Sequence, residues 1–399
     1  MGLQSKASSK RGLLKRALAG LSLIALAACE PISLGPVSVG GGGNSGQTID
    51  TSRPVPVALL IPKSDSGAAS VARSLENAAR LAIADLDGVQ IDLRVYDTAG
   101  DAGRAALLAQ QAVNDGAKII LGPLFGEAAN AAGVAVADDN VNVVAFSNNA
   151  TIAGGNVFIL GPTFRNTANR LANYMQRTDR DSVVILHNNG ASGQLGRVAV
   201  QAASAQNGVR VDGAFGYDFS QESLSSAMAQ ATAAIQSAGT STVMITDDYE
   251  GGLPLILDQL PAQGISPANT TFAGLARFDV RRDAFLLKGM ENSLFAMPDQ
   301  NMIGNFRARY QQAYGSSPHP LAGLGFDGIA AIGALIARGD QNALTRSGLM
   351  QSAGFQGVGG VFRFRPDGTN ERGLAVATIR DQQVVILEQA PRSFSGPGF

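Results

Sequence analysis

Short apolar runs alternate with segments of helical periodicity in the first part of this chain. The runs have the length of β-strands and occupy residues 57–61, 91–96, 118–121 and 143–146. The segments between them place apolar residues three or four positions apart, which is the spacing of one helix face. Strand–helix–strand units with connections of a few residues predict a parallel sheet with helices on both faces.

The same alternation resumes after a break near Thr163. A helix is predicted over residues 166–176. Further strands, separated by alanine-rich helical segments, are predicted over 183–186, 209–215, 243–245 and 271–273. Residues 301–337 turn helical, and residues 360–387 have the pattern of strands joined by turns. The sequence therefore predicts an α/β fold with two doubly wound lobes, each built on a parallel sheet.

Composition excludes several classes of protein. The 399 residues include one cysteine and two histidines, too few for a disulfide scaffold or a zinc cluster. We expect no metal and no cofactor. The residues from Cys29 onward carry 26 basic and 32 acidic side chains. A body of that charge offers no electrostatic reason to bind nucleic acid, because such affinity comes mostly from lysine and arginine at phosphates.

The N-terminal segment has the features of a targeting signal. Five basic residues precede an apolar stretch over residues 17–28, which is too short to cross a bilayer and is typical of a signal peptide. The sequence Leu26-Ala27-Ala28-Cys29 resembles the bacterial lipobox, which implies cleavage before Cys29 and acylation of its thiol. The alternative is an ordinary signal peptide that contains a cysteine. Residues 29–53, rich in Gly, Ser and Pro, are predicted to be a flexible tether.

Polar and small residues follow the predicted strands. In open parallel sheets, ligands bind beyond the carboxyl ends of strands, where helix N-termini present unpaired amides. We therefore expect ligand-binding residues among Ser64, Asp65, Gly122, Pro123, Leu124, Phe125, Ser147, Asn148, Asn149, Asn188, Asp248 and Tyr249. The alternative is that these are ordinary turns, which use the same residue types. The acids after residues 243–245, Asp247, Asp248 and Glu250, could face a ligand ammonium or simply be solvated.

Catalytic signatures are weak. The chain lacks the nucleophile elbow G-x-S-x-G, the phosphate-binding P-loop and the zinc motif H-E-x-x-H. Residues 323–328 match G-x-G-x-x-G but follow a proline-containing loop rather than a strand, so we interpret them as the small-residue face of a packed helix. His187 is interpreted as a structural residue at a strand end. We therefore expect a protein that is not an enzyme.

Several segments carry a family resemblance. They are residues 57–62, 96–98, 116–124, 144–148, 354–357, 362–368, 370–376 and 390–394. On these segments the chain resembles type I periplasmic binding proteins of the leucine-binding kind, and within them the lipoproteins called penicillin-binding protein activators. The resemblance implies two lobes joined by three chain crossings, near Thr163, Ser293 and Met350. The first lobe would comprise residues 54–163 and 294–350, the second 164–293 and 351–390, with residues 391–399 as a tail.

The resemblance also implies a function and partners. It implies a lipid-anchored protein that stimulates a penicillin-binding protein or other cell-wall synthase. Glu30 after the cysteine is compatible with the periplasmic face of the outer membrane. The alternative is the substrate-binding protein of an ABC transporter for amino acids or a related solute. A small cell-wall-derived ligand is a further expectation.

Two departures from the pattern of this fold family weaken the expected contacts with an amino-acid ligand. Ser192-Gly193 stands where amino-acid receptors of this fold commonly have Tyr-Gly, and Leu275-Ala276-Arg277 stands where their ammonium-binding acid follows.

Overall fold

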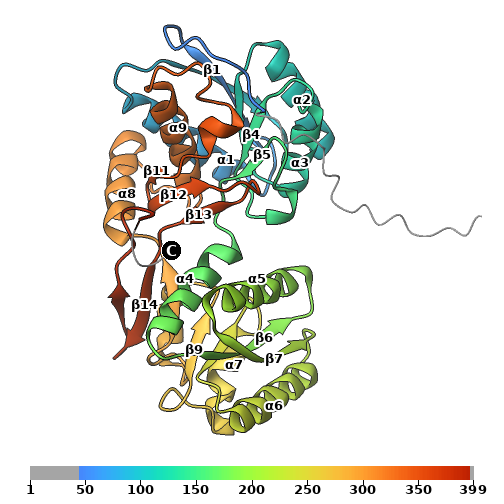
Figure 1. Ribbon diagram of the computed structural model, residues 1–399, viewed down its shortest axis with the longest axis vertical. Helices are drawn as coiled ribbons and strands as arrows, with labels where there is room; N and C mark the ends of the chain where they lie inside the picture. Colours follow the sequence, from blue (N-terminus) through green and yellow to red (C-terminus); the bar gives the residue numbers. More distant parts are fainter. Residues whose placement is uncertain (1–44, 396–399) are drawn as a thin grey trace, which may run out of the picture. The chain divides into compact units, whose positions relative to one another are not determined.

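The computed structural model describes residues 45–395 and contains three sheets (Figure 1). The predicted signal peptide, the acylation of Cys29 and most of the tether lie outside the described residues. So do residues 396–399 of the tail. Among the described residues, we find no helix that combines the length and the apolar character needed to span a membrane.

The first sheet is entirely parallel and has the strand order β2-β1-β3-β4-β5. Its strands are β1 (Val55–Ile61), β2 (Ile91–Asp97), β3 (Ile119–Leu121), β4 (Asn142–Ala145) and β5 (Val157–Ile159). Alternate residues of β1 enter two different cores. Leu59 packs in the core that includes α1 (Ala69–Ala84) and α9 (Gly323–Ile336), and Leu60 packs in the core of α2 (Ala102–Asn114) and α3 (Gly126–Ala135). Helices therefore cover both faces, as predicted.

The second sheet is mostly parallel and has the order β15-β14-β10-β9-β8-β6-β7. Its parallel strands are β6 (Ser182–Asn188), β7 (Arg210–Tyr217), β8 (Thr242–Ile245), β9 (Thr271–Gly274) and β10 (Leu294–Met297). The hairpin of β14 (Ala375–Arg380) and β15 (Gln383–Glu388) extends it in antiparallel orientation. Helix α4 (Phe164–Arg177) precedes β6, and α5 (Ala191–Asn207), α6 (Gln221–Ala238) and α7 (Leu253–Gln259) connect the parallel strands that follow.

A small antiparallel sheet packs into the core of the first sheet. It consists of β11 (Phe355–Gly357), β12 (Gly360–Phe364) and β13 (Asn370–Arg372). Phe364 contacts Phe158 of β5 edge to face, with ring centroids 5.4 Å apart. The remaining helices are α8 (Gln300–Tyr314) and α10 (Arg346–Leu349), and the short 3₁₀ segments are η1 (Ala150–Ile152), η2 (Pro261–Gln263), η3 (Phe278–Val280) and η4 (Arg282–Leu286).

The fold class inferred from the strand and helix pattern is confirmed, and two crossings lie later than expected. We expected residues from 294 onward to belong to the first lobe, but β10 is hydrogen-bonded within the second sheet. The helices after it do return to the first lobe, because α9 packs against α1 and both contribute to the core around β1. The chain therefore leaves the second sheet after Met297. We also expected residues 351–390 to belong to the second lobe, but the phenylalanines of β11 and β12 pack in the core around β1, and the chain re-enters the second sheet only with β14.

The interpretation of the G-x-G-x-x-G segment is also confirmed. Gly323, Gly325 and Gly328 are all buried in α9. A side chain on Gly325 would overlap the backbone of Leu75 in α1, and one on Gly328 would overlap the side chain of Leu121 in β3. These glycines therefore allow close helix packing rather than phosphate binding.

Candidate functional site

A hollow of about 530 Å³, here called the first hollow, opens at the carboxyl ends of β1, β3 and β4. Its walls are mostly apolar, with a few polar side chains. It is lined by Asp65, Gly67, Ala68, Val71, Leu124, Phe125, Phe146, Ser147, Asn148, Pro162 and Leu321. Its size and composition are those of a site for a small organic ligand.

The turn after β3 positions one wall of the first hollow. Gly122 has a φ of +89°, and a side chain there would overlap the carbonyl oxygen of Leu60, so only glycine fits this close approach. The Phe146 N–H donates to the Pro123 carbonyl at 3.0 Å, which ties the turn to the end of β4. Gly122 and Pro123 do not line the hollow themselves, whereas Leu124 and Phe125 do.

Unpaired amide donors lie beside this wall at the start of α3. Phe125, the N-cap residue, supplies no side-chain hydrogen bond, and the first N–H with a backbone acceptor is that of Ala129, which donates to Phe125 at 2.9 Å. Among the described residues, the N–H groups of residues 126–128 have no acceptor. Such groups, together with the helix dipole, favour an anion.

Ser147 adds a hydroxyl to these donors. A Cβ placed on Gly126 would lie 3.4 Å from the Ser147 Oγ, so the hydroxyl is adjacent to the helix start. The Ser147 Oγ accepts from the N–H of Asn149 at 3.1 Å, which leaves its proton available for a ligand. Asn149 does not line the hollow. Its Oδ1 caps η1 by accepting from the Thr151 N–H at 3.0 Å. Asn148 is exposed and lines the hollow.

One acid faces the same hollow. The Asp65 Oδ1 accepts from the N–H groups of Gly67 at 2.9 Å and Ala68 at 2.7 Å, before α1 begins. Among the described residues, no donor is hydrogen-bonded to its Oδ2. Ser64 is exposed and does not line the hollow; its N–H donates to Asp97 at 3.1 Å.

The three candidate residues of the second lobe do not line the first hollow. Asn188 is buried; its side chain donates to Asp247 and accepts from the Gly190 N–H at 2.9 Å. The Tyr249 hydroxyl donates to the Phe278 carbonyl at 2.7 Å, and burial, followed by the negative charge of Asp279, raises the pKa of Tyr249 to about 12. Asp248 is exposed and accepts from the Glu250 N–H at 3.0 Å.

Asp247, not Asp248, is the acid that the fold buries after β8. Its side chain accepts from Asn188, from the Tyr217 hydroxyl and from the Gly252 N–H, the last at 2.7 Å. Burial, followed by the hydrogen bond to Asp247, raises the pKa of Tyr217. The only sequence signal was that Asp247 directly follows an apolar run, and that signal does not distinguish it from its solvated neighbours.

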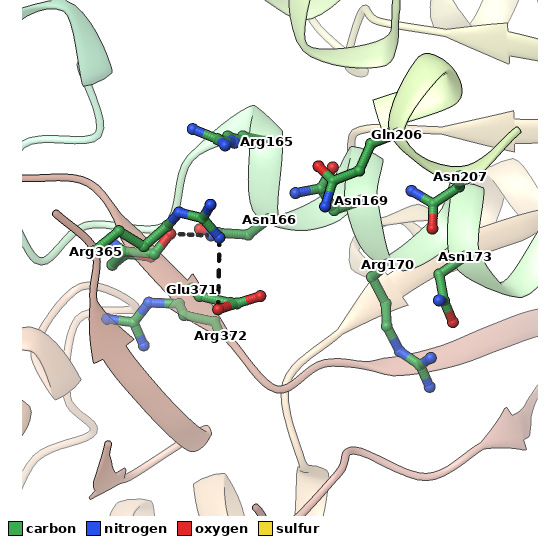
Figure 2. Close-up of a pocket in the computed structure, with 11 residues that line it drawn as sticks. Arg165, Asn166, Asn169, Arg170, Asn173, Gln206, Asn207, Arg365, Glu371 and Arg372 are labelled. Carbon is green, nitrogen blue, oxygen red and sulfur yellow. Dashed lines mark hydrogen bonds and ion pairs between the residues drawn. The ribbon is translucent and has the colours of Figure 1, made fainter. Parts of the chain in front are cut away.

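A polar hollow beside α4 has a structural explanation. Figure 2 shows the Arg365 guanidinium over Asn166 and the Arg372 guanidinium directed away from α4. Asn166 donates to the Asn370 carbonyl at 3.0 Å, and Arg365 lies 3.6 Å from Glu371. Arg170 pairs with Glu388 at 3.1 Å. These side chains join α4 to the strands β13 to β15, so we interpret the cluster as a structural junction.

Comparison with known proteins establishes the family. A family model described as periplasmic binding protein matches residues 54–383. The chain belongs to the periplasmic binding protein family. Membership of this family indicates a periplasmic location, and its members are binding proteins rather than enzymes. No curated protein matches the chain.

Solved structures support the same fold. A putative branched-chain amino acid ABC transporter protein from Rhodospirillum rubrum is 19% identical, with a TM-score of 0.71 over 84% of this chain and 100% of that one. A branched-chain amino acid ABC transporter periplasmic ligand-binding protein from Burkholderia xenovorans is 17% identical. Its TM-score is 0.65, and the match covers 85% of this chain and 96% of that one. An ABC transporter substrate-binding protein from Desulfitobacterium hafniense in complex with Leu is 17% identical. Its TM-score is 0.60, and the match covers 84% of this chain and 100% of that one. These likenesses establish the leucine-binding type of fold.

Proposed function

We propose that this protein binds a small apolar solute bearing a carboxylate, in the first hollow, and delivers it to an ABC transporter. The observation that carries the proposal is the group of unpaired amide donors at the start of α3, with the Ser147 hydroxyl beside them. A carboxylate placed there would accept hydrogen bonds from donors that have no other partner among residues 45–395. Charge-assisted bonds of this kind are stronger than bonds between neutral groups.

The rest of the hollow suits the body of such a solute. Leu124, Phe125, Phe146 and Val71 offer apolar surface, and burying a ligand against it is favourable by about 25 cal/mol per Å². Asp65 supplies a carboxylate with one free oxygen, which suits an ammonium group. The combination favours an apolar amino acid, the ligand class of the Desulfitobacterium structure solved with Leu.

Thermal unfolding of the purified full chain tests the proposal. We expect leucine to raise the melting temperature, because a ligand at a hundredfold excess over its Kd stabilises the folded state by about 2.7 kcal/mol. 4-Methylpentanoate, which lacks the ammonium, should have a smaller effect. 4-Methylpentanamide, which lacks both charged groups, should have none.

Two serine variants make a matched pair for this test. Ser147→Ala removes the proposed donor and should weaken leucine binding about tenfold, the cost of losing a hydrogen bond to a charged group. Ser64→Ala changes an exposed serine outside the hollow and should leave leucine binding unaltered. Equal binding of the carboxylate and the carboxamide, or an equal effect of the two variants, would contradict the proposal.

A second candidate is activation of a penicillin-binding protein or other cell-wall synthase, as the narrower sequence resemblance implies. It is favoured by the second lobe, where Leu275-Ala276-Arg277 stands in the segment that holds the ammonium-binding acid of amino-acid receptors, and Arg277 pairs with Asp279. Addition of the full chain to a peptidoglycan synthase from the same organism would test it. A faster rate of glycan polymerisation supports activation, and an unchanged rate opposes it.

We further propose that the protein is anchored in the outer membrane through acylated Cys29. The support is the lipobox-like sequence and Glu30 after it. Mass spectrometry of the native protein should show an N-terminal peptide that begins at Cys29 and carries acyl chains. An unmodified cysteine in that peptide would refute the anchor.

A further inference from the structure

A separate hollow of about 330 Å³, here called the acidic hollow, lies at the carboxyl ends of β7 and β8, near the starts of α6 and α7. None of the residues that line it lines the first hollow. The volume falls in the range of sites for small organic ligands.

Two exposed apolar side chains form walls of the acidic hollow. Phe219 is 75% exposed and Leu255 is 47% exposed, and the buried Leu224 also lines the hollow. A ligand that covers these apolar side chains removes their surface from water, which makes the free energy of binding more favourable.

The charged side chains that line the hollow are all acidic, and the start of α6 beside them is capped by the Ser220 hydroxyl, which accepts from the Ser223 N–H at 3.2 Å. Asp218 and Glu250 line it, whereas no lysine, arginine or histidine does. The Asp218 Oδ1 accepts from the Asn189 side chain at 3.0 Å, which leaves the Oδ2 available. The charge of Glu250 acts on Arg281, which is itself paired with Asp283 at 2.6 Å. A cation in the hollow would therefore find carboxylate oxygens at its rim.

The buried acid Asp247 lies beneath the residues that line the acidic hollow. Asp247 is 5% exposed, and its hydrogen-bond donors are neutral groups, two of which belong to the lining residues Tyr217 and Gly252. No lysine or arginine within residues 45–395 forms an ion pair with it. A buried carboxylate without a counterion creates a negative potential in the space above it, which favours a cationic ligand.

We propose that the acidic hollow binds an organic ammonium ion with an apolar body. The ammonium group would lie between Asp218 and Glu250, above Asp247, and the apolar body would cover Phe219 and Leu255. This site is independent of the carboxylate site proposed for the first hollow.

Calorimetric titration of the full chain with 2-phenylethylammonium tests the proposal, with 2-phenylethanol as the neutral analogue of the same shape. We expect the ammonium ion to bind at least tenfold more tightly than the alcohol at low salt, and this preference to shrink as salt screens the charges. The double variant Asp218→Asn, Glu250→Gln should weaken ammonium binding at least fivefold and change alcohol binding less than twofold. Phe219→Ala should weaken both.

A variant of the first hollow assigns the signal to the acidic hollow. Asp65→Asn alters the acid of the first hollow and should leave the ammonium titration unchanged. A loss of ammonium binding in Asp65→Asn, equal affinity for the two compounds, or full affinity in the double variant would overturn the proposal. Leucine binding is measured separately and depends on the first hollow, so failure of one site is distinguishable from failure of the other.

Discussion

Replacement of Gly325 by alanine should lower the free energy of unfolding by about 3 kcal/mol, the upper part of the usual range for overpacking. The reason is the contact between α9 and α1, where the new methyl group would overlap the carbonyl oxygen and backbone of Leu75. Backbone in a packed helix cannot move aside cheaply. Denaturant unfolding followed by circular dichroism measures the change.

Two other glycines provide graded controls for this prediction. In Gly328→Ala the atoms nearest the added carbon belong to the side chain of Leu121, which can rotate, so we expect a smaller loss of stability. Gly304 lies exposed in α8 with no atom within 4 Å of the added carbon, and Gly304→Ala should stabilise the chain by about 0.5–1 kcal/mol. A Gly325→Ala protein as stable as the wild type would contradict the packing described for α9.

Removal of the Asp327 carboxylate should lower the free energy of unfolding at least as much, by about 3–5 kcal/mol. Asp327 is buried in α9; it accepts from the Val358 N–H at 2.7 Å and lies 3.4 Å from the Arg372 guanidinium. Burial raises the pKa of Asp327 and lowers the pKa of Arg372, because desolvation opposes both charges. Asp327→Ala would leave the Arg372 charge buried beside the Phe362 ring without its counterion.

A double variant separates loss of the pair from loss of packing. Replacing both partners with apolar residues, Asp327→Leu and Arg372→Met, should recover part of the stability lost in Asp327→Ala, because no unpaired charge remains. Asp258→Asn breaks an exposed pair with Lys288 at 3.9 Å and should change stability by less than about 0.5 kcal/mol. Equal losses for Asp327→Ala and Asp258→Asn would contradict the buried pair.

Most strands and helices of the two parallel sheets could be predicted because each depends on local periodicity, but β5 and β10 are not among the expected strands. Strand pairing at the chain crossings could not be predicted from the sequence. The four residues of β10 are apolar like those of any buried strand, and their pairing with both β9 and β14 is a long-range choice. For the same reason, the antiparallel addition of the hairpin β14–β15 to a parallel sheet has no signature in the sequence of the hairpin itself.

The candidate site shows the same division between local and tertiary information. Topology places every loop after a parallel strand at one edge, which is why Asp65, Phe125 and Ser147 could be selected together and do line one hollow. Composition alone does not reveal which polar side chains are already engaged. Asn188 and Asn149 look equally suitable in the sequence, but the first is bonded to Asp247 and the second caps η1.

The most direct test of the proposed function is a crystal structure of the full chain grown with leucine at saturating concentration. We expect density for leucine in the first hollow, with a carboxylate oxygen within hydrogen-bond distance of the Ser147 Oγ and of an N–H at the start of α3. Leucine bound elsewhere on the molecule, or a first hollow that holds only water under these conditions, would contradict the proposed function.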